Sequence, residues 1–181
     1  MNFTPRIKRL LKQHWVSLAL IGLVAFMWFR PPAWVSDMNE PLPDLAFTTL
    51  DGRAGTTHGL RGKVVLVNFW ATWCPYCRHE MPAMQAFYTD YQSRGFEMLA
   101  MSVDDDPAKA ASFMRDNGYT FPALMATQEH TQAFGGVSRL PVSYIIDRNG
   151  RIVHKISGQV HYARMQSLVE PLLSPSPGDR K

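Results

Sequence analysis

The chain has few cysteines, no acidic residue at its start and no excess of charge in its body. Only two cysteines occur in 181 residues, which excludes a small scaffold held together by many disulfides. Four of the nineteen basic residues and none of the fifteen acids fall in the first twelve positions, so basic and acidic residues balance in the rest. A neutral body gives no support for nucleic-acid binding, because that function needs a basic surface. With 46% hydrophobic residues the chain can bury a core.

A hydrophobic run without charges follows a basic arm of residues 1–14. Residues 15–29 would span roughly 22 Å as a helix, against a hydrocarbon core of roughly 30 Å, and interfacial tryptophans with Arg30 can extend that span. Three interpretations stay open: an uncleaved signal anchor over residues 15–30, a cleaved signal peptide, and a buried core helix. The anchor is favoured because bulky residues and prolines stand where a signal peptidase needs small side chains. The cations precede the run, which predicts that the body is exported.

Proline-rich segments border the body. Four prolines make residues 31–43 a stiff, extended spacer, and residues 174–181 are interpreted as a disordered tail. Between them, residues 44–173 alternate between strand and helix patterns and begin with a hairpin, which predicts an α/β fold with a mixed central sheet flanked by helices. The expected strands cover residues 45–50, 63–70, 96–103, 121–125, 142–147 and 151–157. The expected helices cover residues 75–94, 106–118, 129–134 and 161–173.

The two cysteines are spaced C-x-x-C at the junction between an expected strand and an expected helix. Cys74 and Cys77, separated by Pro75 and Tyr76, follow a hydrophobic run and open the helix over residues 75–94. Unpaired backbone N–H groups and the helix dipole favour a thiolate at such an N-terminus. The second cysteine lies one turn inward, near enough to attack a mixed disulfide formed at the first. The pattern predicts a redox dithiol in which Cys74 attacks and Cys77 resolves.

Two other uses of the cysteine pair stay open. A purely structural disulfide would stabilise little, because the gain grows with the length of the closed loop, and this loop has four residues. A metal site on Cys74, Cys77 and His79 would need a fourth ligand, and the sequence has no second C-x-x-C or H-x-H. The redox reading therefore predicts no metal and no cofactor besides the disulfide. The acidic run at residues 104–106 is interpreted as an exposed loop that ends in a helix N-cap at Asp106.

The residues around the pair resemble the active-site segment of the thioredoxin fold. The resemblance rests on Phe-Trp-Ala-Thr-Trp-Cys-Pro-Tyr-Cys at residues 69–77, on Pro82 within the helix, and on Gly-Val-Ser-Arg-Leu-Pro at residues 136–141. It covers roughly residues 41–173 and is strongest with the exported, membrane-anchored TlpA/ResA/CcmG (DsbE) family of thiol-disulfide oxidoreductases. This implies a thioredoxin fold with an N-terminal hairpin and an inserted helix–strand unit, preceded by one transmembrane helix.

The same resemblance implies a set of substrate-binding residues. It places a cis peptide bond between Leu140 and Pro141, facing the attacking thiol, where backbone groups of Leu140 can receive an extended client segment. Trp73 would shield one side of the thiol and give clients an apolar rim, with a core aromatic residue as the alternative. Pro75 and Tyr76 complete the expected set.

Glu80 is the expected proton acceptor for Cys77. Thioredoxins carry a buried Asp on the strand before the motif, and the matching position here is Asn68, which cannot take a proton. The resemblance offers Glu80 instead, three residues beyond Cys77 and thus on the same side of the helix. If its side chain turns inward, burial raises its pKa towards the range useful for proton transfer. A solvated helix carboxylate is the alternative.

The resemblance implies an extracytoplasmic reductase of protein disulfides, with cytochrome c maturation as one setting. The implied partners are client proteins with disulfides or C-x-x-C pairs, a CcdA- or DsbD-like membrane electron donor, and the bacterial inner membrane, with the catalytic domain in the periplasm. No nucleic acid is expected. Two other classes stay open, a thiol peroxidase and a Sco-like copper-delivery protein. The first would need P-x-x-x-T-x-x-C where residues 67–74 read VNFWATWC, and the second spaces its cysteines C-x-x-x-C.

Overall fold

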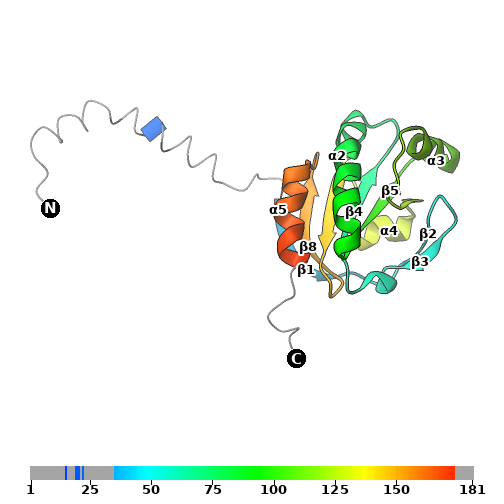
Figure 1. Cartoon of the computed structure of the whole chain (residues 1–181), viewed down its shortest axis with the longest axis horizontal. Helices are drawn as coiled ribbons and strands as arrows, with labels where there is room; N and C mark the ends of the chain where they lie inside the picture. The colour runs from blue at the N-terminus through cyan, green and yellow to red at the C-terminus, as the bar shows by residue number, and fades with distance from the viewer. Residues whose placement is uncertain (1–14, 16–18, 21, 23–34, 174–181) are drawn as a thin grey trace, which may run out of the picture. The chain divides into compact units, whose positions relative to one another are not determined.

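The computed structural model describes one continuous body and four isolated residues before it, namely residues 15, 19–20, 22 and 35–173 (Figure 1). The whole basic arm, most of the expected transmembrane segment and the expected tail lie outside the described residues. Among the residues that are described, no helix is both long enough and apolar enough to span a bilayer.

A six-stranded mixed sheet forms the centre of the body, with strand order β1-β8-β7-β4-β5-β6. β4, β5 and β6 are parallel to one another, whereas the pairs β4–β7, β7–β8 and β8–β1 are antiparallel. A separate two-stranded sheet joins β2 to β3. The strands are β1 (Val35–Pro41), β2 (Ala46–Thr48), β3 (Ala54–Thr56), β4 (Val64–Trp70), β5 (Phe96–Ser102), β6 (Ala123–Met125), β7 (Val142–Ile146) and β8 (Arg151–Ser157).

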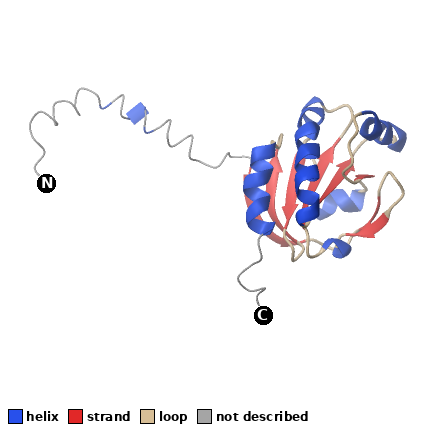
Figure 2. Cartoon of the chain, viewed as in Figure 1, coloured by secondary structure: helices blue, strands red, loops and turns tan. Residues whose placement is uncertain are grey.

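Helices cover both faces of the sheet, as Figure 2 shows. α2 and α5 lie against each other in front of the sheet in Figure 1, and α4 lies behind it. The helices are α2 (Pro75–Tyr91), α3 (Pro107–Asp116), α4 (Gln128–Ala133) and α5 (Tyr162–Leu173), with short 3-10 turns η1 (His58–Leu60) and η2 (Gln92–Arg94). This is the helix-flanked mixed sheet that the resemblance implies.

The sheet divides the core into two apolar layers. Alternate residues of β5 show this division: Met98 packs in the layer that also holds side chains of α2, α3 and α5, and Leu99 packs in the layer closed by Phe134 and Leu45. Side chains of a strand point alternately to opposite faces. A sheet covered on both faces needs strands without polar alternation, which explains the nearly continuous hydrophobic run at residues 63–70.

β4 is the central element that positions the cysteine pair. All seven of its residues are buried, and it pairs with β5 on one side and β7 on the other. At its carboxyl end the Val103 N–H donates to the Trp70 carbonyl at 2.9 Å, and the chain then enters α2 within five residues. The helix expected over residues 75–94 is confirmed, with its last three residues as the 3-10 turn η2.

The predicted spacer over residues 31–43 needs correction, because Val35–Pro41 forms β1, an edge strand paired with β8. The strand carries an irregularity between Asp37 and Glu40, so its side chains do not alternate regularly, and only Val35 and Met38 are partly buried. Pro41 is tolerated because it ends an edge strand, where a missing N–H costs no sheet hydrogen bond. The sheet therefore begins nine residues before the expected domain boundary at residue 44.

The bridge between β5 and β7 contains α3, β6 and α4, in agreement with an inserted helix–strand unit. Asp106 caps α3 as predicted, since its side chain accepts a hydrogen bond from the Ala108 N–H at 2.9 Å. β6 is an edge strand of the sheet. The turn between β2 and β3 partly covers this edge, because Thr49 forms a β-bridge with Leu124 and the Leu50 N–H donates a hydrogen bond to the Ala123 carbonyl.

Candidate functional site

Cys74 and Cys77 form a disulfide at the N-terminal end of α2. Cys74 is the N-cap residue, and its Sγ accepts a hydrogen bond from the Cys77 N–H at 3.2 Å. Pro75 occupies the first helical position, where a residue without an N–H loses no helical hydrogen bond. The Cys74 N–H donates to the Ala71 carbonyl at 3.1 Å, which closes the turn between β4 and the helix. The predicted placement of the pair between a buried strand and a helix is confirmed.

The two cysteines differ in their accessibility from the surface. Cys74 is 4% exposed and lines a surface cleft of about 480 Å³, whereas Cys77 is fully buried and does not line that cleft. A client that enters the cleft therefore meets Cys74 first. The residues that line the cleft are Trp73, Cys74, Pro75, Tyr76, Val103, Thr131, Val137, Ser138, Arg139 and Leu140.

The loop after α4 forms the wall of the cleft opposite α2. α4 is followed by Gly135 and Gly136, with φ values of 74° and 84°, a backbone region in which any side chain would be strained. The loop then reaches Leu140 and Pro141, and the peptide bond between them is cis, as the resemblance implies. Leu140 lines the cleft together with Cys74, whereas Pro141 is buried behind the lining.

Two large aromatic side chains stand exposed beside the cleft. Trp73 is 67% exposed and Tyr76 is 66% exposed, so the alternative of Trp73 as a core aromatic is excluded. The Gln159 side chain donates a hydrogen bond to the Tyr76 carbonyl at 3.0 Å, which ties the segment after β8 to the first turn of α2. Exposed aromatic side chains around a cleft offer the apolar contact area that a protein client can bury.

Glu80 lies in the core beneath the cysteine pair, with 1% of its surface exposed. Its Oε1 accepts a hydrogen bond from Asn68 Nδ2 at 2.9 Å, and its Oε2 accepts one from the Val160 N–H at 2.7 Å. Burial raises the pKa of Glu80 to about 7, although both hydrogen bonds act in the opposite direction. The solvated helix carboxylate is excluded, and the inward turn of the side chain is confirmed. Cys77 is buried on the same helix, three residues earlier.

Asn68 holds this carboxyl, a role that the sequence analysis missed. Its Nδ2 also donates to Ser143 Oγ at 3.0 Å, while its Oδ1 is buried without a partner among the described residues. Rotating the amide would turn Oδ1 towards Glu80 and Ser143, and both could then donate to it when Glu80 is protonated. The Asn68 amide can therefore hydrogen-bond Glu80 in either protonation state of the carboxyl. The signal in the sequence was a polar residue inside the hydrophobic run of β4.

A second buried carboxylate fixes the loop that precedes the cysteine pair. Asp104 is 7% exposed and accepts hydrogen bonds from the Thr72 N–H at 3.0 Å, from Thr72 Oγ1 at 2.7 Å and from Ser102 Oγ at 2.7 Å. The prediction of an exposed loop is wrong at Asp104, because these donors compensate for the loss of water around the carboxylate. Asp104 connects the end of β5 to the residue two positions before Cys74.

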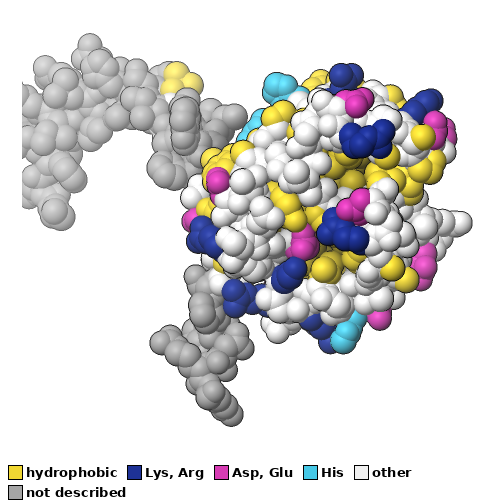
Figure 3. Space-filling view, turned by 45° about the vertical axis from the view of Figure 1, so that its right-hand side comes forward, with side chains coloured by type: hydrophobic (Ala, Val, Ile, Leu, Met, Phe, Trp, Pro, Cys, Tyr) yellow, Lys and Arg dark blue, Asp and Glu magenta, His cyan; other side chains and the backbone are white. Residues whose placement is uncertain are grey.

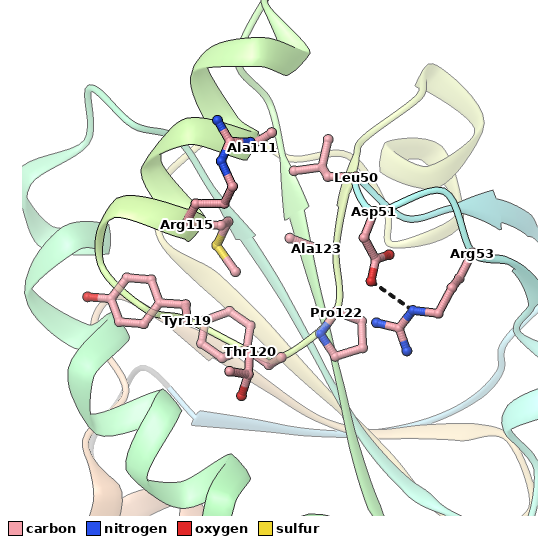
Figure 4. Close-up of a pocket in the computed structure, with 11 residues that line it drawn as sticks. Leu50, Asp51, Arg53, Ala111, Arg115, Tyr119, Thr120, Pro122 and Ala123 are labelled. Atoms are coloured by element: carbon pink, nitrogen blue, oxygen red, sulfur yellow. Dashed lines mark hydrogen bonds and ion pairs between the residues drawn. The ribbon is translucent and has the colours of Figure 1, made fainter.

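A second cavity, of about 330 Å³, lies away from the cysteine pair between the N-terminal hairpin, α3 and the segment before β6. Figure 4 shows Asp51 and Arg53 on one side of it and Arg115 on another. Arg53 pairs with Asp51 at 2.9 Å, and Arg115 donates to Ser112 Oγ at 3.0 Å. None of the predicted site residues lines this cavity, and its guanidinium groups already have partners.

Charged side chains of both signs lie on the surface of the described body (Figure 3). On the face in Figure 3, cationic and anionic side chains are interspersed, with hydrophobic side chains exposed between them. Across the described residues, no group of three or more His, Cys, Asp or Glu side chains is placed to hold a metal ion. His79 is exposed on α2.

Comparison with known proteins gives consistent matches. The sequence model of the Redoxin family matches residues 38–169. The chain is 34% identical to the thiol-disulfide oxidoreductase ResA of Geobacillus thermodenitrificans, over 78% of this chain and 81% of the relative. It is 31% identical to ResA of Bacillus anthracis, over 83% and 89% of the two chains.

Solved structures agree with these sequence matches. A thiol:disulfide interchange protein of the thioredoxin family from Chlorobium tepidum superimposes with a TM-score of 0.71 at 33% identity, over 77% of this chain and 99% of that one. A putative thiol:disulfide interchange protein DsbE from Chlorobium tepidum gives a TM-score of 0.68 at 26% identity, over 76% and 99%.

The buried carboxyl of Glu80 should make the stability of the protein depend on pH. Its pKa in the folded protein, about 7, lies above the ordinary value of 4.5, so between these values the folded state binds more protons than the unfolded state. Its contribution is fully present below about pH 4.5 and is lost as the pH rises through 7. The free energy of unfolding should fall over that window by roughly 3 kcal/mol on account of this group.

Urea unfolding of the oxidised protein at pH 4.5 and pH 8 measures this loss. Glu80→Gln should remove most of the difference between the two pH values, and Glu129→Gln, a matched change of an exposed helical carboxylate, should leave it unchanged. Equal pH dependence in the wild type and Glu80→Gln would show that burial does not raise the pKa of Glu80.

Proposed function

Because the chain belongs to the Redoxin family and is a thiol-disulfide oxidoreductase of the TlpA/ResA/CcmG (DsbE) type, we propose that it reduces disulfides of client proteins through Cys74 and Cys77. One observation carries the assignment of roles: Cys74 lines the open cleft as the N-cap of α2, and Cys77 is fully buried behind it. The thiol that clients can reach attacks, and the hidden thiol resolves.

In the proposed cycle the reduced protein gives two electrons to a client disulfide. The Cys74 thiolate attacks one client sulfur, the client disulfide breaks, and a mixed disulfide forms while one client thiolate leaves. Cys77 then loses its proton and attacks Cys74 Sγ, which breaks the mixed disulfide and releases the second client thiolate. The protein is left as the Cys74–Cys77 disulfide that the structure contains. The N–H of Cys77, which donates to Cys74 Sγ, stabilises the sulfur as a thiolate.

Glu80 takes the proton from Cys77 in this proposal. A carboxyl with a pKa of about 7 exists in both protonation states near neutral pH, so it can accept a proton and release it again. Its hydrogen bonds to Asn68 and to the Val160 N–H hold it below the helix turn that carries Cys77. The Asn68 amide keeps a hydrogen bond to the carboxyl in both states.

The cleft is the proposed client-binding site. Trp73, in the turn before α2, forms its exposed rim together with Pro75 and Tyr76 in the first turn of the helix, and Leu140 lines the cleft from the loop that ends at Pro141. An extended client segment would lie along this loop and pair with backbone groups of Leu140, as strands added to a sheet edge do.

The cellular setting is proposed from the sequence. An uncleaved anchor over residues 15–30 would hold the domain at the bacterial inner membrane, on its periplasmic side. Clients would include apocytochrome c with its C-x-x-C heme site. Since each turnover oxidises the protein, a CcdA- or DsbD-like membrane protein would return electrons to it.

Replacement of each cysteine should cause a different defect in catalysis. Cys74→Ser should reduce insulin disulfide reduction to the uncatalysed rate, because the reachable nucleophile is gone. Cys77→Ser should keep a reactive Cys74 and accumulate mixed disulfides with clients, because no second thiol resolves them. Non-reducing gels and mass spectrometry identify the trapped species. Faster alkylation of Cys77 than of Cys74 in the reduced protein would reverse the assigned roles.

Replacing Glu80 should slow the resolving step. Glu80→Gln keeps the shape of the side chain and removes the proton acceptor, so resolution of a preformed mixed disulfide between pH 6 and 8 should slow by about 10- to 100-fold. Stopped-flow measurement of the resolving rate against pH tests this, with Glu129→Gln as the matched control. Superimposable profiles for the wild type and Glu80→Gln between pH 5 and 9 would mean that another group or water takes the proton.

The anchor has its own test. Full-length protein expressed in a bacterial host should stay in the membrane fraction after a carbonate wash, and externally added protease should degrade the catalytic domain in spheroplasts. Deletion of residues 1–30 should leave a soluble domain with the same insulin reductase activity. Recovery of a mature soluble form that begins near residue 30 from the full-length gene would show cleavage instead.

A further inference from the structure

The cleft beside Cys74 contains a single charged side chain. Of its ten lining residues, nine are apolar, hydroxyl-bearing, sulfur-bearing or aromatic, and only Arg139 carries a charge. Arg139 is exposed and directly precedes Leu140, the residue whose backbone faces the client in the proposed function. A lone cation at this place would contact whatever segment lies beside the reacting disulfide.

The guanidinium of Arg139 has no partner within residues 35–173. The ion pairs of this part of the chain are Arg53–Asp51, Lys63–Glu97 and His154–Asp37, and no side-chain hydrogen bond or cation–π contact involves Arg139. In the second cavity, by contrast, Arg53 and Arg115 are already hydrogen-bonded within the protein.

The acids near the cysteine pair do not neutralise Arg139. Glu80 is buried with its own partners, and Asp104 accepts hydrogen bonds from Thr72 and Ser102. Asp106 caps α3, and Asp105 is exposed in the same loop but forms no ion pair with Arg139.

Other positive charge lies on the α2 side of the pair. Arg78 is exposed in the first turn of α2, and the N-terminal end of that helix adds a partial positive charge at Cys74. The surroundings of the attacking sulfur therefore favour a negative side chain on the client and disfavour a positive one.

From this arrangement we propose that Arg139 selects client segments that carry an acidic side chain two residues from the reacting cysteine. The inference rests on the proposed function and names its substrate class. An extended segment places residues i and i+2 on one side, about 6.6 Å apart, so a carboxylate two positions from the reacting cysteine can reach the guanidinium while the client sulfur lies at Cys74. The interaction forms in a cleft lined largely by apolar groups, which strengthens a charge-assisted hydrogen bond.

The test uses synthetic peptides with one intramolecular disulfide, identical except for Asp, Ser or Lys at one position. The variable residue is placed in turn two positions before and two positions after the reacting cysteine. The reduced full-length protein is mixed with each peptide, and the second-order rate of disulfide exchange is measured at 20 mM and 500 mM salt. Two electrons pass from the protein dithiol to the peptide disulfide, so the products are the protein disulfide and the peptide dithiol.

We expect the wild type to react about five to ten times faster with the best Asp peptide than with the matching Lys peptide at low salt. The ratio should fall below about two at 500 mM salt, because screening then acts over roughly 4–5 Å. Arg139→Gln should bring the ratio close to one, and Arg139→Glu should favour the Lys peptide. Rates are divided by that of the Ser peptide, which removes any change in the reactivity of Cys74 itself.

Arg115→Gln serves as the matched control, since Arg115 is also exposed but lies in the second cavity. It should keep the wild-type ratio at both salt concentrations. A wild type that does not distinguish Asp from Lys, or an Arg139→Gln variant that keeps the full ratio, overturns the inference and leaves the proposed function intact. A wild type that fails to reduce even the Ser peptide overturns the proposed function.

Discussion

One buried carboxyl joins the parts of the fold that meet beneath the cysteine pair. Glu80 belongs to α2, its partner Asn68 belongs to β4, and its other partner, the Val160 N–H, lies in the segment between β8 and α5. An ionised carboxylate in such a place is costly in free energy unless hydrogen-bond donors surround it. Burial disfavours the charged form of Glu80, whereas its two hydrogen-bond donors favour that form. The same carboxyl therefore connects three parts of the fold and has a pKa of about 7.

The central elements could be predicted from the sequence because local patterns determine them. The buried run of β4, the apolar spacing along α2 and the Asp-Pro start of α3 each have one dominant interpretation, and the structure has them at nearly the expected residues. β1 could not be predicted in this way. Its irregular pairing near Asp37 removes the alternation that identifies a strand, and its place in the sheet depends on β8, more than a hundred residues away.

In the candidate site, too, features that depend on neighbouring residues could be predicted, whereas contacts between residues far apart in the sequence could not. The C-x-x-C spacing, the helix N-terminus and the position of Glu80 are local, and the inward turn of Glu80 agrees with the prediction. The contact of Asn68 with Ser143 joins residues 75 positions apart, and Asp104 lies 32 positions from Thr72. No spacing rule connects such pairs. An acidic residue in a loop is usually solvated, so only the folded chain reveals that Asp104 is enclosed by hydroxyl and amide donors.

The edge strand β1 also has a mechanical consequence. β1 is the first strand of the described body, and five residue pairs join it to β8 in antiparallel register. A load along the axis of β1 would act on this ladder in shear, so its hydrogen bonds would have to yield together. A load across the strands would instead open them one after another, as in unzipping. The edge of the sheet therefore resists a load along β1 more strongly than a load that peels the strand from β8.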